Sequence, residues 1–136
     1  MPSFRDDVRA EAPPEEVWKV LYDPRRLPEW WVGVETVEPE PRPPASAEAA
    51  YTMYLAGYPD YPMPQRMRTD RAKQRVVVSC QVSDLEYAWS LAPHGAGTHI
   101  TVDVLIPERE AARLSAQQDC IARSLRRLAE VASRAV

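Results

Sequence analysis

The last quarter of the chain, roughly residues 108–134, constrains the fold more than any other stretch. This run contains no glycine or proline and is rich in Ala, Leu, Arg, Gln and Glu, which favour helix. Pro107 suits the first helical position, because that position needs no N–H donor. A helix of this length would extend roughly 40 Å, so it must lie across a larger surface and bury one stripe. The apolar residues that recur along one face of the predicted helix are Leu114, Ile121, Leu125, Leu128 and Ala132.

The N-terminal residues predict one strand followed by two short helices. Residues 3–11 alternate in character, and the face with Phe4, Asp6, Val8 and Ala10 is the more apolar. Two prolines and two glutamates at residues 13–16 are typical of a helix start. Asp23 stands before a proline, so it should end this helix and cap a second one that runs to Trp30. We expect Trp30 and Trp31 to begin the next strand, and residues 39–48 to form a loop.

The segment from residue 51 to residue 105 predicts antiparallel hairpins with testable registers. The expected turns fall at residues 72–73, 83–84 and 93–96. In all three hairpins the apolar side chains then share one face, while polar or small side chains share the other. A slip of one residue would invert this pattern, which makes the assignment of faces specific. The predicted pairs include Met67–Val78, Cys80–Tyr87, Val78–Trp89 and Trp89–Ile100.

Composition limits the classes of function. A chain of 136 residues is expected to form a single domain spanning residues 1–136. The net charge of −3 argues against nucleic acid as the main partner, because phosphate binding needs a basic face. No apolar run is long enough to span a membrane, and the N-terminus lacks the apolar core of a signal peptide. Cys80 and Cys120 are expected to be free thiols, which indicates a reducing, cytoplasmic location.

The sequence offers little for metal, nucleophilic or phosphate chemistry. His94 is expected in a turn and His99 on the outer face of its strand, so neither suggests a metal site. Cys80 should point inward, where apolar surroundings would raise its thiol pKa and leave it inert. No glycine-rich loop could cradle a phosphate. No cofactor and no metal are therefore expected.

The predicted inner faces of sheet and helix either fill a core or enclose a cavity. Their polar members are nearly all neutral, which suits an apolar or aromatic ligand with a few hydrogen-bonding oxygens. Tyr87 is the best candidate to hydrogen-bond an enol or enolate, and Asp6 is a second, weaker catalytic candidate. For Tyr87 an ordinary core role, and for Asp6 a strand end open to water, are the competing interpretations. The candidate ligand-binding residues are Trp30, Tyr51, Met53, Gln65, Met67, Val78, Cys80, Tyr87, Trp89, Ile100, Leu114, Gln118, Ile121 and Leu125.

Residues 57–64 form an unusual loop, with two tyrosines and a methionine between three prolines. Such a stiff, apolar segment could serve as a lid or a dimer contact. An ordinary proline-stiffened hairpin loop is the competing interpretation. A homodimer is plausible for a protein of this class.

Residues 12–34 resemble the opening of the SRPBCC superfamily (START / Bet v 1-like), and within it the polyketide cyclase/dehydrase group. The matching features are the proline pair before Glu-Glu-Val-Trp, the Asp23-Pro24 pair, Pro28-Glu-Trp-Trp31 and Gly33-Val34. The hairpin beginning at Trp89 and the final helix agree as well. The resemblance implies an α+β helix-grip fold, in which a curved, seven-stranded antiparallel sheet wraps around the long C-terminal helix. It also implies a hydrophobic cavity between them, although it transfers no catalytic residue.

Three functions are compatible with this pattern. The first is binding of a hydrophobic or aromatic molecule (polyketide, lipid or phenolic), with cyclase or dehydratase activity by positioning and hydrogen bonding. The second is a non-catalytic carrier or sensor that uses the same cavity. The third is a protein-interaction module whose cavity has collapsed. A buried acid or tyrosine in an open cavity would favour an enzyme, whereas a cavity filled by Trp30, Met67 and Trp89 would favour the interaction module.

Overall fold

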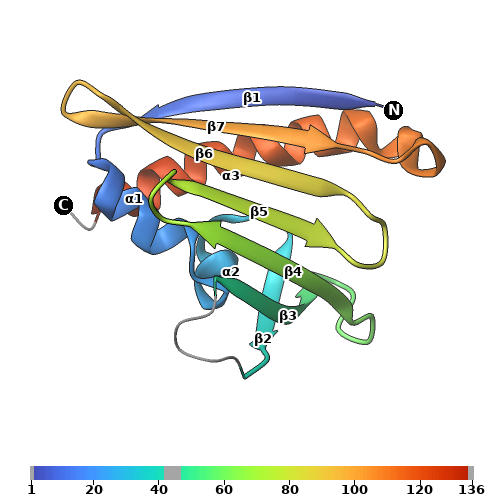
Figure 1. Cartoon of the computed structure of the whole chain (residues 1–136). Coiled ribbons are helices and arrows are strands. Elements are labelled where there is room, and N and C mark those ends of the chain that lie inside the picture. Colours follow the sequence, from blue (N-terminus) through green and yellow to red (C-terminus); the bar gives the residue numbers. More distant parts are fainter. Residues whose placement is uncertain (1, 42–46, 135–136) are drawn as a thin grey trace.

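In the computed structural model, which describes residues 2–41 and 47–134, seven strands form one antiparallel sheet in the order β1-β7-β6-β5-β4-β3-β2. The long helix α3 lies behind the sheet, along β1 and β7 (Figure 1). The expected helix-grip architecture is confirmed. The elements are β1 Ser3–Ala10, α1 Pro14–Leu21, the 3-10 helix η1 Pro24–Arg26, α2 Leu27–Trp30, β2 Val34–Pro39, β3 Glu48–Leu55, β4 Met63–Asp70, β5 Arg75–Cys80, β6 Glu86–His94, β7 Gly97–Leu105, η2 Glu108–Arg113 and α3 Leu114–Arg134.

The C-terminal helix begins later than its composition predicts. Residues 108–113 form the 3-10 helix η2, and Pro107 is the N-cap residue of η2 rather than its first helical residue. Nothing in η2 is buried, so no packed stripe holds it in the α-helical geometry. From Leu114 onward the predicted stripe is buried at Ile121, Leu125, Leu128 and Ala132. The burial of this stripe therefore stabilises the α-helical conformation from Leu114 onward.

The short helices lie where the sequence places them, but the following strand does not begin at the tryptophans. The Asp23 side chain accepts a hydrogen bond from the Arg25 N–H and caps η1. Trp30 ends α2, and the Trp31 N–H still donates to the Leu27 carbonyl at 2.8 Å. Gly33 then turns the chain into β2 with a positive φ of 93°. The expectation that Trp30 and Trp31 begin a strand was therefore wrong.

The hairpin faces are as predicted, while two of the three registers differ by two residues. Met67 lies opposite Val78, as expected. Val78 pairs with Tyr87 instead of Trp89, because a five-residue loop with Asp84 at a φ of 60° replaces the expected two-residue turn. Trp89 pairs with Val102 instead of Ile100, because Gly95, at a φ of 62°, permits a two-residue turn between His94 and Gly97. A register shift of two residues leaves every side chain on its predicted face of the sheet, because side chains alternate with a period of two.

The buried core lies between this face, α1 and α3. Trp30, Trp89, Met67 and Leu125 are all at most 1% exposed. The loop expected at residues 39–48 is bounded by β2, which ends at Pro39, and β3, which begins at Glu48. Residues 42–46 of that loop lie outside the described residues.

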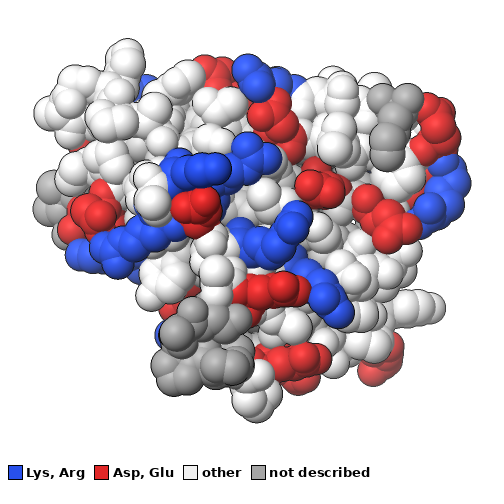
Figure 2. Space-filling model, viewed as in Figure 1, with Lys and Arg blue, Asp and Glu red and all other residues white. Residues whose placement is uncertain are grey.

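The outer face of the sheet is charged. Figure 2 shows basic and acidic side chains intermixed on this face, on the side away from α3. The ion pairs Arg5–Asp103 and Arg66–Glu48 join neighbouring strands there, at 2.7 and 3.1 Å. Within the described ranges, no helix is both long and apolar enough to cross a bilayer.

Candidate functional site

A partly open cavity of about 250 Å³ lies between the β2–β6 part of the sheet and the start of α3. Its apolar wall includes Trp31, Val34, Met53, Leu55 and Leu85. Among the described residues, no carboxylate, histidine or lysine lines it. The polar side chains that line it are those of Tyr51, Tyr58, Gln65, Cys80, Ser83, Tyr87, Arg113, Gln117 and Cys120.

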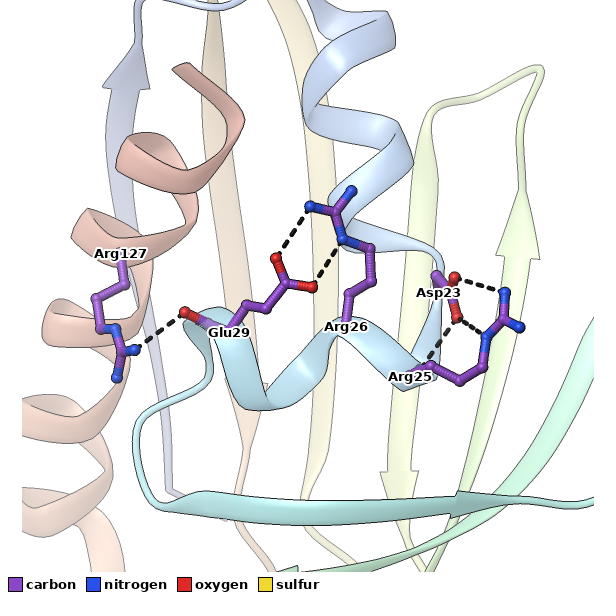
Figure 3. Close-up of polar contacts among 5 residues, drawn as sticks. All are labelled: Asp23, Arg25, Arg26, Glu29 and Arg127. Carbon is purple, nitrogen blue, oxygen red and sulfur yellow. Dashed lines mark hydrogen bonds and ion pairs between the residues drawn. The ribbon is translucent and has the colours of Figure 1, made fainter. Parts of the chain in front are cut away.

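Contacts between the α2 region and α3 build one wall of this cavity. The Arg127 guanidinium donates to the Glu29 carbonyl at 3.0 Å (Figure 3). Two residues beyond Trp30, the Val32 N–H donates to the buried Ser124 hydroxyl at 3.0 Å. These contacts hold the chain on either side of Trp31 against the helix. Figure 3 also shows Asp23 paired with Arg25, and Arg26 paired with Glu29, on the outer side of this region.

Four aromatic rings divide the interior into a packed half and an open half. Trp30 and Trp89 are fully buried and meet edge to face, with ring centroids 5.0 Å apart. Trp31 meets Tyr87 edge to face at 4.8 Å, and both residues line the cavity. Such pairs fix ring positions more firmly than area burial alone. The aromatic cluster thus forms the boundary of the cavity rather than filling it.

The structure separates the candidate ligand-binding residues into two groups. Tyr51, Met53, Gln65, Val78, Cys80 and Tyr87 line the cavity. The others do not. They are Trp30, Met67, Trp89, Ile100, Ile121 and Leu125, which are buried in the core, Leu114, which packs partly buried against that core, and Gln118, which is exposed.

Two further placements differ from expectation. Gln117, rather than Gln118, reaches the cavity, because neighbouring helical residues point about 100° apart. Asp6 is half-buried on the edge strand β1, where its carboxylate accepts the Asp7 N–H at 2.8 Å, and it does not line the cavity. Sequence reasoning placed Ser83 in a hairpin turn and assigned neither Ser83 nor Gln117 to the ligand site. Their participation depends on the β5–β6 loop and on the rotation of α3, which only the packed structure specifies.

The two buried tyrosines differ in their hydrogen bonding. The Tyr87 hydroxyl donates to the Gln117 side-chain oxygen at 2.8 Å, so its proton is already engaged. The Tyr51 hydroxyl is buried and has no hydrogen-bond partner in the described part of the chain. Burial is the main cause that raises the pKa of both phenols, so both stay protonated at neutral pH. Tyr51 is therefore the available donor, whereas the sequence favoured Tyr87.

The expectation of an inert Cys80 with a raised pKa was wrong in direction. Burial alone would raise the pKa of the Cys80 thiol, but hydrogen bonds from Ser83, Gln65 and the Val82 N–H together lower it. The pKa of Cys120 is raised by burial, and its thiol donates to the Val32 carbonyl at 3.4 Å. Both cysteines are free thiols, as expected.

Both histidines lie outside the cavity. His94 accepts a hydrogen bond from Arg9 at 2.9 Å, and His99 lies 2.6 Å from the Asp7 carboxylate. In residues 2–41 and 47–134, no group of three or more His, Cys, Asp and Glu side chains is arranged to hold a metal.

The loop after β3 borders the cavity mouth. Tyr58 lines the cavity, and its ring meets that of Tyr61 at 6.0 Å. Both side chains are more than half exposed. A role for this loop as a lid or a dimer contact stays a prediction.

Residues 1–133 match the family described as polyketide cyclase / dehydrase and lipid transport. The chain belongs to this family. The expected assignment to the SRPBCC superfamily is thereby confirmed for this polyketide cyclase/dehydrase family member. No curated protein matches the sequence.

Solved structures show the same fold at low identity. The Zhui aromatase/cyclase from Streptomyces sp. R1128 has a TM-score of 0.78 and 14% identity, over 98% of this chain and 94% of that one. A protein from Thermus thermophilus has a TM-score of 0.74 and 20% identity, over 98% and 99% of the two chains. Ara h 8.0201 has a TM-score of 0.65 and 12% identity, over 96% and 97%. These similarities establish the fold of this family member and leave its ligand open.

Proposed function

We propose that the protein binds a small, mostly apolar ring compound in the cavity between the sheet and α3. The observation that carries this proposal is the cavity itself, with its apolar and aromatic wall and its neutral hydrogen-bonding groups. A cavity of about 150 Å³ accepts benzene. A cavity of about 250 Å³ therefore suits a compound of one or two rings better than a long extended chain.

The lining favours binding and positioning over acid–base catalysis. General acid–base catalysis requires a titratable group near the reacting atoms, and no described carboxylate or histidine lines the cavity. The neutral phenol of Tyr51 is suited to hold a carbonyl or enol oxygen in place. The similarity to the Zhui aromatase/cyclase supports cyclisation by such positioning as a second candidate function. Turnover of a bound compound separates this function from that of a carrier or sensor.

The observed packing bears on the third interpretation, a collapsed cavity. Trp30, Met67 and Trp89 are indeed fully buried and belong to the hydrophobic core. Tyr51 nevertheless lies buried beside a partly open cavity, which these three side chains do not line. We therefore prefer ligand binding to a purely protein-binding role.

Thermal unfolding with a panel of one- and two-ring aromatic, phenolic and fatty compounds tests the proposal. A ligand that binds only the folded state should stabilise it by about 2.7 kcal/mol at a hundred times its dissociation constant. Met53→Trp should fill the cavity and abolish the shift, because Met53 lines it. Tyr54→Trp is the matched control on the same strand, because neighbouring strand residues point to opposite faces.

Two outcomes would contradict the proposal. One is the absence of a shift with every compound while the wild-type protein remains folded, in which case the exposed loop with Tyr58 and Tyr61 becomes the site to test for a protein partner. The other is an equal shift in wild type and Met53→Trp, which would place the binding site elsewhere.

A further inference from the structure

The Tyr51 hydroxyl is a buried hydrogen-bond donor without a partner in residues 2–41 and 47–134. Four buried side-chain polar atoms have no partner among the described residues, and they belong to Trp30, Tyr51, Gln74 and Trp89. Only Tyr51 among them lines the cavity, and its side chain is 1% exposed. A buried donor without a partner destabilises the protein, so its presence at a cavity wall indicates a ligand acceptor.

Other polar groups of the cavity are engaged. Tyr87 donates to Gln117 at 2.8 Å, and Cys120 donates to the Val32 carbonyl at 3.4 Å. The Arg113 guanidinium at the mouth pairs with Glu110. Unlike these groups, the Tyr51 hydroxyl has no hydrogen-bond partner among the described residues.

Tyr51 stands at the end of a polar row that crosses three strands. Tyr51 on β3 pairs with Gln65 on β4, and Gln65 pairs with Cys80 on β5. All three side chains are buried and line the cavity. The neighbouring row on the same face, Met53 and Met63, is apolar. On β3, β4 and β5 the polar side chains that line the cavity therefore lie in this one row.

The charge of the ligand follows from the same surroundings. Arg113, the only cationic side chain among the described lining residues, is already paired with Glu110. A carboxylate brought to Tyr51 would lose its hydration without gaining a counter-charge, which is strongly unfavourable. A neutral carbonyl oxygen accepts one hydrogen bond and carries no such penalty.

We infer that the cavity binds a neutral cyclic or aryl ketone with its carbonyl oxygen on the Tyr51 hydroxyl. The rings of the ketone then lie against Trp31 and Met53. This inference rests on the proposed function and adds the chemical class and the orientation of the ligand.

Binding of a matched ketone and hydrocarbon to wild type, Tyr51→Phe and Tyr87→Phe tests the inference. The pair 1-tetralone and tetralin shares a two-ring skeleton and differs mainly in the carbonyl group. Isothermal titration should show a dissociation constant for tetralone about two- to tenfold higher in Tyr51→Phe than in wild type. The constant for tetralin should stay unchanged. Tyr87→Phe should not weaken tetralone selectively, because the Tyr87 proton is bound to Gln117.

Tyr51→Phe removes only an unpaired hydroxyl, so the variant should fold. A measurement on wild type alone provides an independent check. The infrared carbonyl band of bound, ¹³C-labelled tetralone should shift to lower frequency than in an alkane solvent, as a hydrogen-bonded carbonyl does.

The possible failures are distinguishable. Both compounds could bind with the same ratio of dissociation constants in wild type and Tyr51→Phe. The hydrogen bond from Tyr51 to the ketone would then be wrong, while the proposed function stands. A ketone-selective loss in Tyr87→Phe instead of Tyr51→Phe would also overturn the inference. Tighter binding of 1-naphthoate than of tetralone would overturn the exclusion of anions. If no compound binds, both the inference and the proposed function fail.

Discussion

Cys80 and Cys120 lie on the sheet side and the helix side of the same cavity, yet their surroundings have opposite effects. Hydrogen bonds outweigh burial at Cys80 and lower its pKa, whereas burial dominates at Cys120 and raises it. The thiolate is the reactive form of cysteine. Two thiols of one cavity should therefore react over different pH ranges.

Alkylation with iodoacetamide tests this difference in single-cysteine variants. In Cys120→Ser, the rate at Cys80 should rise with pH at a midpoint below the ordinary value of a cysteine thiol. In Cys80→Ser, the midpoint at Cys120 should lie above that value. Mass spectrometry of the alkylated protein gives both rates, and the reverse order of midpoints would contradict the assignment.

Asp23 contributes stability that depends on pH. Burial would raise its pKa, but hydrogen bonds and the charge of Arg25 lower it below the ordinary value. The unfolded chain then binds more protons than the native chain near pH 4, so stability is present above that pH and is lost as the pH falls. Asp23→Asn keeps an oxygen that can accept the Arg25 N–H but removes the charge.

The variant Asp23→Asn should be less stable than wild type by about 0.5–1 kcal/mol at pH 7, after allowance for solvent screening. The difference should shrink as the pH falls below the ordinary carboxyl pKa of about 4, and it should vanish once Asp23 is protonated in the folded protein. Urea unfolding at a series of pH values measures it. A difference that persists undiminished in acid would show that the cap, rather than the charge, is responsible.

At the scale of elements, the β6–β7 hairpin and β1 meet at Gly97. A Cβ atom added there would lie 2.1 Å from the Ala10 carbonyl oxygen, a distance that the backbone cannot accommodate without moving. Since Thr98 pairs with Ala10, this contact occurs at the end of the β1–β7 ladder. Glycine at this position lets the edge strand approach closely.

Gly97→Ala should therefore destabilise the protein by about 1–3 kcal/mol, as overpacked substitutions do. Denaturant unfolding gives the change, and hydrogen exchange should locate it at the Ala10 end of β1. Ala96→Gly in the same turn is the control, because it adds no atom near β1. An unchanged unfolding midpoint for Gly97→Ala would contradict this, because it would mean that β1 and β7 can move apart without any loss of stability.

For the whole molecule, the structure divides into a densely packed half and a half that borders the cavity. β1, β6 and β7 lie in front of α3 in Figure 1, and the inward side chains of these strands belong to the buried core. β2 is an edge strand, mostly exposed, with a register shift between Val34 and Thr36. Local stability follows the density of buried contacts, so the two halves should open with different free energies.

Native-state hydrogen exchange measures this directly. Amides of β2 and its partner β3 should exchange faster than those of β6 and β7 in the free protein. A cavity ligand should slow exchange most in β2 and β3, because Val34, Tyr51 and Met53 line the cavity. Uniform protection with and without ligand would contradict the division.

The sequence determined the order of elements, the faces of the strands and the apolar stripe of α3. Each follows from a local period, of two residues in strands or 3.6 in helices, and such periods survive a register error of two residues. This is why Met67, Val78 and Tyr87 were placed on the correct face although two hairpin registers were shifted. The family resemblance added the count of seven strands.

Only the tertiary structure decided which inward residues meet an open space. Trp89 and Tyr87 share a face, yet the first lies in the core and the second borders the cavity. Which tyrosine keeps a free proton depends on the partner that α3 brings near, and Gln117 reaches Tyr87 but not Tyr51. Periodicity specifies a direction for each side chain, whereas a cavity and a hydrogen bond depend on distances between elements far apart in the chain.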